Sequence, residues 1–142
     1  AVTARALAEL TEYLGRGLSQ ASYTDGLNPA QWSALRILAR ANQGARTVSG
    51  LAAAMLTTKS TTSQTVRALK QKRLIRGTPD KADGRVTYLD LTAEGQRRLQ
   101  RDPLLNLVRR LEALPPAQLE EMTAAVEPLI RAVFDLLQSR RG

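Results

Sequence analysis

A single segment, residues 74–91, interrupts a chain in which helical patterns of apolar residues dominate. Elsewhere, apolar residues recur every three or four positions, as they do along one face of an α-helix. Residues 74–78 and 85–91 have an extended, β-rich character, and residues 79–84 between them are typical of a turn. The pattern therefore predicts a mainly α fold with one small β-hairpin.

Helix-start signals divide the rest of the chain. Asn28 is predicted to form a capping box with Gln31, and Thr58 and Thr92 are good N-cap residues. Pro103 is predicted to break the helix that follows Thr92, because proline lacks a backbone donor and clashes with the preceding turn. The expected order is two helices, a short helix over residues 47–55, a helix over 59–72, the hairpin, and two further helical stretches.

The positive charge is concentrated in the middle of the sequence. The formal net charge is +8, yet residues 26–79 contain no Asp or Glu and nine Lys or Arg. A solvated basic face is the simplest explanation of such a segment. The length of the acid-free stretch favours a surface that faces the phosphates of a nucleic acid.

The predicted helix over residues 59–72 has two unlike faces. Val66 and Leu69, with Thr62, fall on one side and are expected to pack in the core. Hydroxyl, amide and guanidinium groups fall on the other side, where Gln64 and Arg67 suit base edges in a major groove. The helix over 47–55 would support it as the first half of a helix-turn-helix. A merely solvated polar face is the alternative.

The hairpin tip is a second candidate DNA contact. Arg85 is suited to a narrow minor groove, and Gly84 is expected to supply backbone freedom. Asp83 would be repelled by DNA if it were alone, so we expect it to pair with an arginine such as Arg85 and to orient it. The alternative is an ordinary surface turn.

The composition disfavours several other classes of protein. The chain has no Cys and no His, which excludes disulfides, thiol chemistry and the commonest metal ligands. We find no catalytic, cofactor-binding or metal-binding motif and no membrane span, and so predict neither an enzyme nor a cofactor. A non-specific architectural DNA-binding protein and a protein-interaction module remain as alternatives. The amphipathic terminal helices suggest subunit contacts, although they could instead pack on each other within one chain.

Several motifs together resemble the MarR family of winged-helix transcriptional regulators. They are the run from Thr58 to Leu69, the wing-tip sequence Asp83-Gly84-Arg85, and the sequence Leu91-Thr92-Ala93-Glu94-Gly95. The start of the second helix, residues 27–32, is also similar. In place of the glycine that the family often has before the first wing strand, this chain has Arg73.

The resemblance implies one MarR-like domain over residues 1–142, with dimerisation helices at 1–25 and 103–142 and a winged helix-turn-helix at 28–101. It further implies a cytoplasmic homodimer that represses transcription from a palindromic operator in double-stranded DNA and is relieved by a small-molecule effector. Members that sense oxidants through thiols cannot serve as the template, because there is no Cys. The effector would lie between the DNA-binding region and the dimerisation helices.

The candidate site residues follow from the motifs and from location. The candidate ligand residues are Tyr13, Arg16 and Trp32. The candidate DNA-binding residues are Thr58, Lys59, Ser60, Thr61, Ser63, Gln64, Arg67, Lys70, Arg73, Lys81, Asp83 and Arg85.

Overall fold

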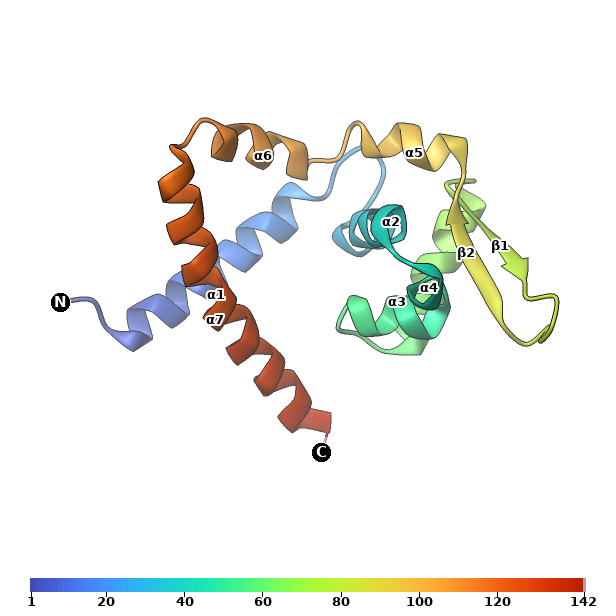
Figure 1. Ribbon diagram of the computed structural model, residues 1–142, viewed down its shortest axis with the longest axis horizontal. Coiled ribbons are helices and arrows are strands. Elements are labelled where there is room, and N and C mark those ends of the chain that lie inside the picture. Colours follow the sequence, from blue (N-terminus) through green and yellow to red (C-terminus); the bar gives the residue numbers. More distant parts are fainter. Residues whose placement is uncertain (142) are drawn as a thin grey trace. The chain divides into compact units, whose positions relative to one another are not determined.

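The computed structural model describes residues 1–141, which form two compact units (Figure 1). Residues 20–102 form the first, which we call the winged unit. Residues 1–19 and the chain from residue 103 onward form the second, which we call the helical unit. The fold is mainly α with one antiparallel two-stranded hairpin, as the sequence predicts.

The winged unit begins with α2 (Pro29–Arg40). The Asn28 side chain accepts a hydrogen bond from the Gln31 backbone at 2.8 Å, and the Gln31 side chain accepts one from the Asn28 backbone at 3.0 Å, which confirms the predicted capping box. A short 3₁₀ helix, η1 (Gln43–Ala45), follows; the sequence did not predict it. Its first turn is held by Asn42, whose side chain accepts from the Ala45 backbone at 3.3 Å.

The rest of this unit contains two further helices, the two strands of the hairpin and a short final helix. They are α3 (Val48–Ala54), α4 (Lys59–Gln71), β1 (Ile75–Pro79), β2 (Thr87–Leu91) and α5 (Ala93–Leu99). In the hairpin, Ile75 is opposite Leu91 and Pro79 is opposite Thr87. The second strand begins later than predicted, because the Val86 N–H donates to the Asp83 carbonyl at 3.0 Å and so belongs to the turn.

One hydrophobic core joins these elements. Its largest fully buried side chains come from α2, α3, α4, the start of the hairpin and β2: Trp32, Leu35, Leu38, Leu51, Leu69, Leu74 and Leu89. The hairpin is also tied to the segment before α3, since the Leu89 N–H donates to the Arg46 carbonyl at 2.6 Å. This core sets the positions of α4 and the hairpin relative to each other.

One short motif connects the end of β2 to the start of α5 and contacts the residues that follow α4. It is Leu91-Thr92-Ala93-Glu94-Gly95. The Thr92 hydroxyl donates to the Arg73 carbonyl at 2.7 Å and accepts from the Gly95 N–H at 3.0 Å. A Cβ on Gly95 would lie far inside contact distance of the Leu74 carbonyl oxygen. The motif therefore fastens the start of α5 against the connection from α4 to β1, and only glycine fits at its last position.

The helical unit contains most of α1 (Ala4–Ala21), together with α6 (Leu104–Glu112) and α7 (Pro116–Arg141). The predicted break at Pro103 is confirmed, because α5 ends at Leu99 and α6 begins at Leu104. Neither α1 nor α6, both described throughout, contains a buried residue. Over residues 1–141, no helix combines the length and apolar character that a membrane crossing requires.

Candidate nucleic-acid interface

Helix α4 separates its residues into a buried face and an exposed face. Thr62 and Leu69 are fully buried, and Val66 is 4% exposed. The buried Thr62 hydroxyl is satisfied within the helix, since it donates to the Thr58 carbonyl at 2.9 Å. The three residues predicted to face the core therefore do so.

The opposite face of α4 is polar and accessible. Gln64 and Arg67 are exposed, as their positions predicted, and Ser63 is half-buried. The other candidate residues in this region, namely Thr58, Lys59, Ser60, Thr61 and Lys70, are exposed. This face contains no acidic side chain, because the sequence has none between residues 26 and 79.

The start of α4 is capped as predicted. The Thr58 side chain accepts a hydrogen bond from the Thr61 N–H at 3.1 Å, while its hydroxyl donates to the Thr61 hydroxyl oxygen at 3.0 Å. The Thr58 hydroxyl thus both accepts and donates within the first turn of α4. The turn between α3 and α4 places Leu56 in the left-handed region, with φ of 59°.

Helix α3 lies close against the segment that precedes it. A Cβ on Gly50 would come within 2.7 Å of the Gly44 carbonyl oxygen, so η1 and α3 approach backbone to backbone. The α3 side chains Leu51 and Ala52 are buried beneath α4. The two helices form the predicted helix-turn-helix arrangement, in which α3 supports α4.

The wing tip confirms the predicted pairing of Asp83 with an arginine. Asp83 pairs with Arg85, with 3.2 Å between its Oδ1 and the Arg85 Nε, and the Arg85 side chain is 92% exposed. Gly84 does not have a left-handed φ. The Asp83 carboxylate accepts the Arg85 N–H at 3.0 Å, and this contact helps close the turn without a left-handed residue.

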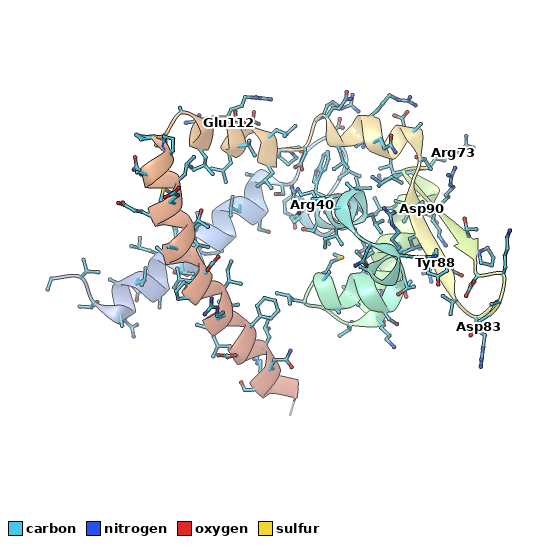
Figure 2. All side chains as sticks on the ribbon, in the orientation of Figure 1. Arg40, Arg73, Asp83, Tyr88, Asp90 and Glu112 are labelled. Carbon is cyan, nitrogen blue, oxygen red and sulfur yellow. The ribbon has the colours of Figure 1, made fainter. Side chains whose placement is uncertain are left out.

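Two more basic candidates lie at the base of the hairpin. Arg73, which follows α4, is exposed and has φ of 60°, a conformation that costs a side-chain-bearing residue energy. The Lys70 ammonium lies beside Gly77 of β1, where a Cβ would come within 3.0 Å of its Nζ. Lys81 is exposed in the turn, and Figure 2 shows Asp83 at the outer end of the hairpin and Arg73 near its base.

The structure adds residues that the sequence reasoning missed. A hollow of about 310 Å³ lies between the start of α3 and the wing, and Thr47, Ser49 and Arg85 help to line it. Thr47 also caps α3, accepting from the Gly50 N–H at 3.1 Å. The sequence carries no local signal for this hollow, because residues distant in the chain form it.

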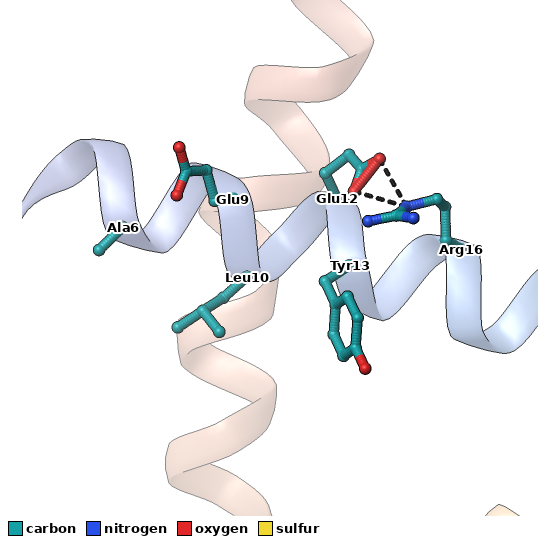
Figure 3. A pocket seen from close by; sticks show the side chains of 6 residues that line it. All are labelled: Ala6, Glu9, Leu10, Glu12, Tyr13 and Arg16. Carbon is teal, nitrogen blue, oxygen red and sulfur yellow. Dashed lines mark hydrogen bonds and ion pairs between the residues drawn. The ribbon is translucent and has the colours of Figure 1, made fainter.

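The three ligand candidates lie in different settings. Tyr13 and Arg16 line a surface hollow of about 610 Å³ along α1, shown in Figure 3. The Arg16 guanidinium lies 5.6 Å from the Tyr13 ring centroid and pairs with Glu12 at 2.8 Å. Trp32 belongs to the winged unit, where its ring is fully buried and its indole N–H donates to the Thr24 carbonyl at 3.3 Å.

Comparison with known proteins identifies the part of the chain that contains this site. The model of the MarR family matches residues 25–86, from the turn before α2 to the end of the wing tip. Residues 25–86 are thus similar in sequence to the MarR family. The resemblance found in the sequence is thereby confirmed. The MarR family is a family of DNA-binding transcription regulators and not a class of enzymes.

Solved structures show that the MarR fold extends over nearly the whole chain. S. aureus MepR in its DNA complex is 20% identical, covers 94% of this chain and 99% of its own, and has a TM-score of 0.74. AbsC, a MarR-family regulator of Streptomyces coelicolor, is 20% identical over 95% of this chain and 98% of its own, with a TM-score of 0.70.

A third similar structure is that of a regulator bound to DNA. M. tuberculosis MosR in its DNA complex is 24% identical, covers 99% of this chain and 97% of its own, and has a TM-score of 0.63. The chain has no match among curated protein sequences. Over its matched residues, the chain thus combines a MarR-family sequence with the winged-helix fold.

Proposed function

We propose that this protein is a sequence-specific, double-stranded DNA-binding repressor that acts as a homodimer in the cytoplasm. The observation that carries the proposal is the exposed polar face of α4, where Gln64 and Arg67 are accessible while Thr62, Val66 and Leu69 anchor the helix from behind. Glutamine pairs well with adenine and arginine with guanine in the major groove. The DNA complexes of MepR and MosR, two proteins of similar fold, support the proposal.

In this proposal the candidate residues divide into three groups. Gln64 and Arg67 read base edges, and Arg85, held by Asp83, enters the minor groove. Ser60, Thr61 and Ser63 lie in the same groove, where their hydroxyls reach base edges or phosphates. The remaining residues contact phosphates, which fix position without reading sequence. They are Thr58, Lys59, Lys70, Arg73 and Lys81.

Two properties typical of the family complete the proposal. We propose that two copies bind a palindromic operator, since exposed apolar side chains along α1 and α7 offer a surface for a second copy. We also propose that a small-molecule effector relieves repression, with Tyr13 and Arg16 as its candidate contacts because they line the hollow on α1. Binding to that hollow is tested by comparing ligand-induced thermal shifts of the wild type and Tyr13→Ala.

The deciding experiment is selection of random duplex DNA by the purified protein. Enrichment of a symmetric motif with half-sites about one helical turn apart would support a dimeric, sequence-specific binder. Salt-dependent binding without an enriched motif would instead indicate the architectural alternative. The affinity for operator should fall steeply with salt, by about 0.9 log units per log unit of salt for each neutralised phosphate.

Alanine variants then test which side chains of α4 read the base sequence. Arg67→Ala and Gln64→Ala should each reduce discrimination between operator and random DNA by about 1–3 kcal/mol. Arg97→Ala, which removes an exposed arginine from α5, is the control and should leave discrimination unchanged. Equal losses on operator and random DNA would contradict base reading by α4.

A further inference from the structure

The outer part of the hairpin has few contacts with the rest of the winged unit. In β1, Ile75 is buried and the residues after it are exposed, and in β2 Leu89 is the buried residue. Within residues 1–141, no hydrogen bond or ion pair joins residues 78–88 to an element outside the hairpin. A two-stranded hairpin is only marginally stable by itself. Its orientation therefore depends on the contacts at its inner end.

Arg46, between η1 and α3, contacts two neighbouring residues of β2. The Leu89 N–H donates to the Arg46 carbonyl at 2.6 Å. The Arg46 side chain pairs with Asp90, with 2.9 Å between Nη1 and the carboxylate Oδ1. Its Nε also donates to the carbonyl of Ala41, the residue that ends α2, at 3.1 Å. One arginine thus connects the hairpin to the end of α2.

The ion pair of Asp90 leaves the hairpin. Asp90 lies opposite Arg76 in the register of the strands, yet it pairs with Arg46. A pair with Arg76 would stabilise only the hairpin, whereas the pair with Arg46 holds the hairpin to the rest of the unit. The Arg46 and Asp90 side chains are 25% and 41% exposed. A pair this accessible adds little to global stability, but it matters to a local element that opens easily.

Farther out, the hairpin is not packed against α3. The hollow of about 310 Å³ lies between the start of α3 and residues 85–87. Figure 2 shows Asp90 toward the inner end of the hairpin and Asp83 at the outer end. The five residues from Asp90 to Arg85 span roughly 17 Å, so a tilt of about 10° at the inner end would move the tip by about 3 Å. Such a shift is as long as a hydrogen bond and would withdraw Arg85 from a base edge.

We propose that Arg46 is a positioning residue for the wing, which holds the hairpin through Leu89 and Asp90 in the orientation that lets Arg85 enter the minor groove. The minor-groove part of this proposal rests on the proposed function. Arg46 itself needs no contact with DNA, because it acts through the hairpin. A molecule whose hairpin is out of place would bind A·T and G·C segments alike.

The first test measures the attachment without DNA, by hydrogen exchange of backbone amides followed by NMR. Arg46→Met keeps an unbranched side chain and removes the guanidinium. Its Leu89 amide should exchange about fivefold faster than in the wild type, because loss of a partly exposed ion pair favours local opening by about this factor. The Leu69 amide in α4 should exchange at the wild-type rate. Asp90→Val removes the same ion pair from the strand and should give the same result.

Arg40→Met is the matched control, because it makes the same replacement at an exposed arginine at the end of α2. Exchange at Leu89 should be unchanged in this control. A wild-type exchange rate at Leu89 in Arg46→Met would overturn the proposal. Equal acceleration at Leu69 would overturn it as well, because the change would then be a global loss of stability.

The second test measures minor-groove preference. The affinity for an operator with an A·T segment where the wing binds is divided by the affinity for the same operator with a G·C segment there. Arg46→Met and Asp90→Val should each lower this ratio about two- to fivefold, because the apparent affinity follows the fraction of molecules with the hairpin in place. The first variant lowers the net charge by one and the second raises it by one, so a loss common to both does not come from net charge.

Arg85→Ala gives the baseline for this ratio. Adding Arg46→Met to Arg85→Ala should cause no further loss of preference, because Arg46 acts through Arg85. An unchanged ratio in either single variant, or an equal loss in Arg40→Met, would overturn the positioning role. If the wild type has no A·T preference, the proposed contact of Arg85 fails, whereas the exchange rate at Leu89 still decides whether Arg46 holds the hairpin.

Discussion

Arg73 occupies a backbone position that suits glycine. Its φ of 60° lies in the left-handed region, where a side chain costs about 1–2 kcal/mol. Replacing it by glycine removes this cost but adds about 0.4–1 kcal/mol of unfolded-chain entropy. We therefore expect Arg73→Gly to raise the free energy of unfolding by about 0.5–1 kcal/mol in urea denaturation, from the difference of these two effects.

The matched control is Arg76→Gly, which makes the same replacement in β1. Arg76 has no left-handed φ, so its replacement should lower the free energy of unfolding, because glycine weakens a strand. Destabilisation of both variants to the same extent would show that the backbone at Arg73 is unstrained.

At the scale of single residues, the sequence predicts the contacts that a side chain makes with residues close to it in the chain. The caps at Asn28, Thr58 and Thr92 were predictable because each side chain bonds to a backbone N–H within the next turn. The conformation of Gly84 could not be predicted, because glycine permits a left-handed φ without requiring it. The sequence shows that Arg73 replaces a glycine that is frequent in the MarR family. Only the structure shows that Arg73 has a left-handed φ.

At the scale of elements, α5 contains a testable charge contact between Glu94 in its first turn and Arg97 in its last turn. The Arg97 side chain donates to the Glu94 carboxylate at 2.7 Å, and this hydrogen bond and the positive charge of Arg97 lower the pKa of Glu94. Because the folded-state pKa lies below the unfolded value, the contact stabilises the fold above the ordinary range of glutamate and is lost as the pH falls through the lowered value.

We accordingly expect Arg97→Ala to raise the pKa of Glu94 toward its ordinary value, as measured by carboxyl NMR titration. Arg131→Ala, which removes an arginine that pairs with Glu127 within α7, should leave the pKa of Glu94 where it is in the wild type. An unchanged Glu94 pKa in Arg97→Ala would show that this contact is not maintained in solution.

Features that depend on the periodic spacing of residues within one element were predicted well. Features that depend on contacts between residues far apart in the chain were not. The two faces of α4 follow from its own spacing, so the exposure of Gln64 and Arg67 was predictable. The role of Arg46 was not, because its carbonyl accepts from Leu89 and its side chain pairs with Asp90 at 2.9 Å, both far along the chain. The hollow beside Arg85 escaped prediction for the same reason.

At the scale of the whole molecule, the helical unit leaves apolar side chains uncovered. Along α7, Met122, Val126 and Ile130 are 44%, 43% and 49% exposed. A monomeric protein rarely leaves such a stripe in water, and in the two-fold dimer that we propose a second copy of the same chain would cover it. We expect the wild type to sediment as a dimer and Ile130→Glu to sediment as a monomer, because the new carboxylate would be buried without a partner.

The control for this variant is Ala124→Glu, which places the same charge on the opposite face of α7, about 120° to 160° around the helix from the apolar stripe. It should remain dimeric.

Loss of the dimer should also weaken binding to a two-half-site operator by about 10²-fold or more, because the second half-site is then no longer bound intramolecularly. The affinity for a single half-site should be equal in the two variants, since neither changes α4 or the wing. Sedimentation of Ile130→Glu as a dimer would exclude this stripe as the subunit contact, and a monomeric wild type that still binds the palindrome tightly would exclude the homodimer itself.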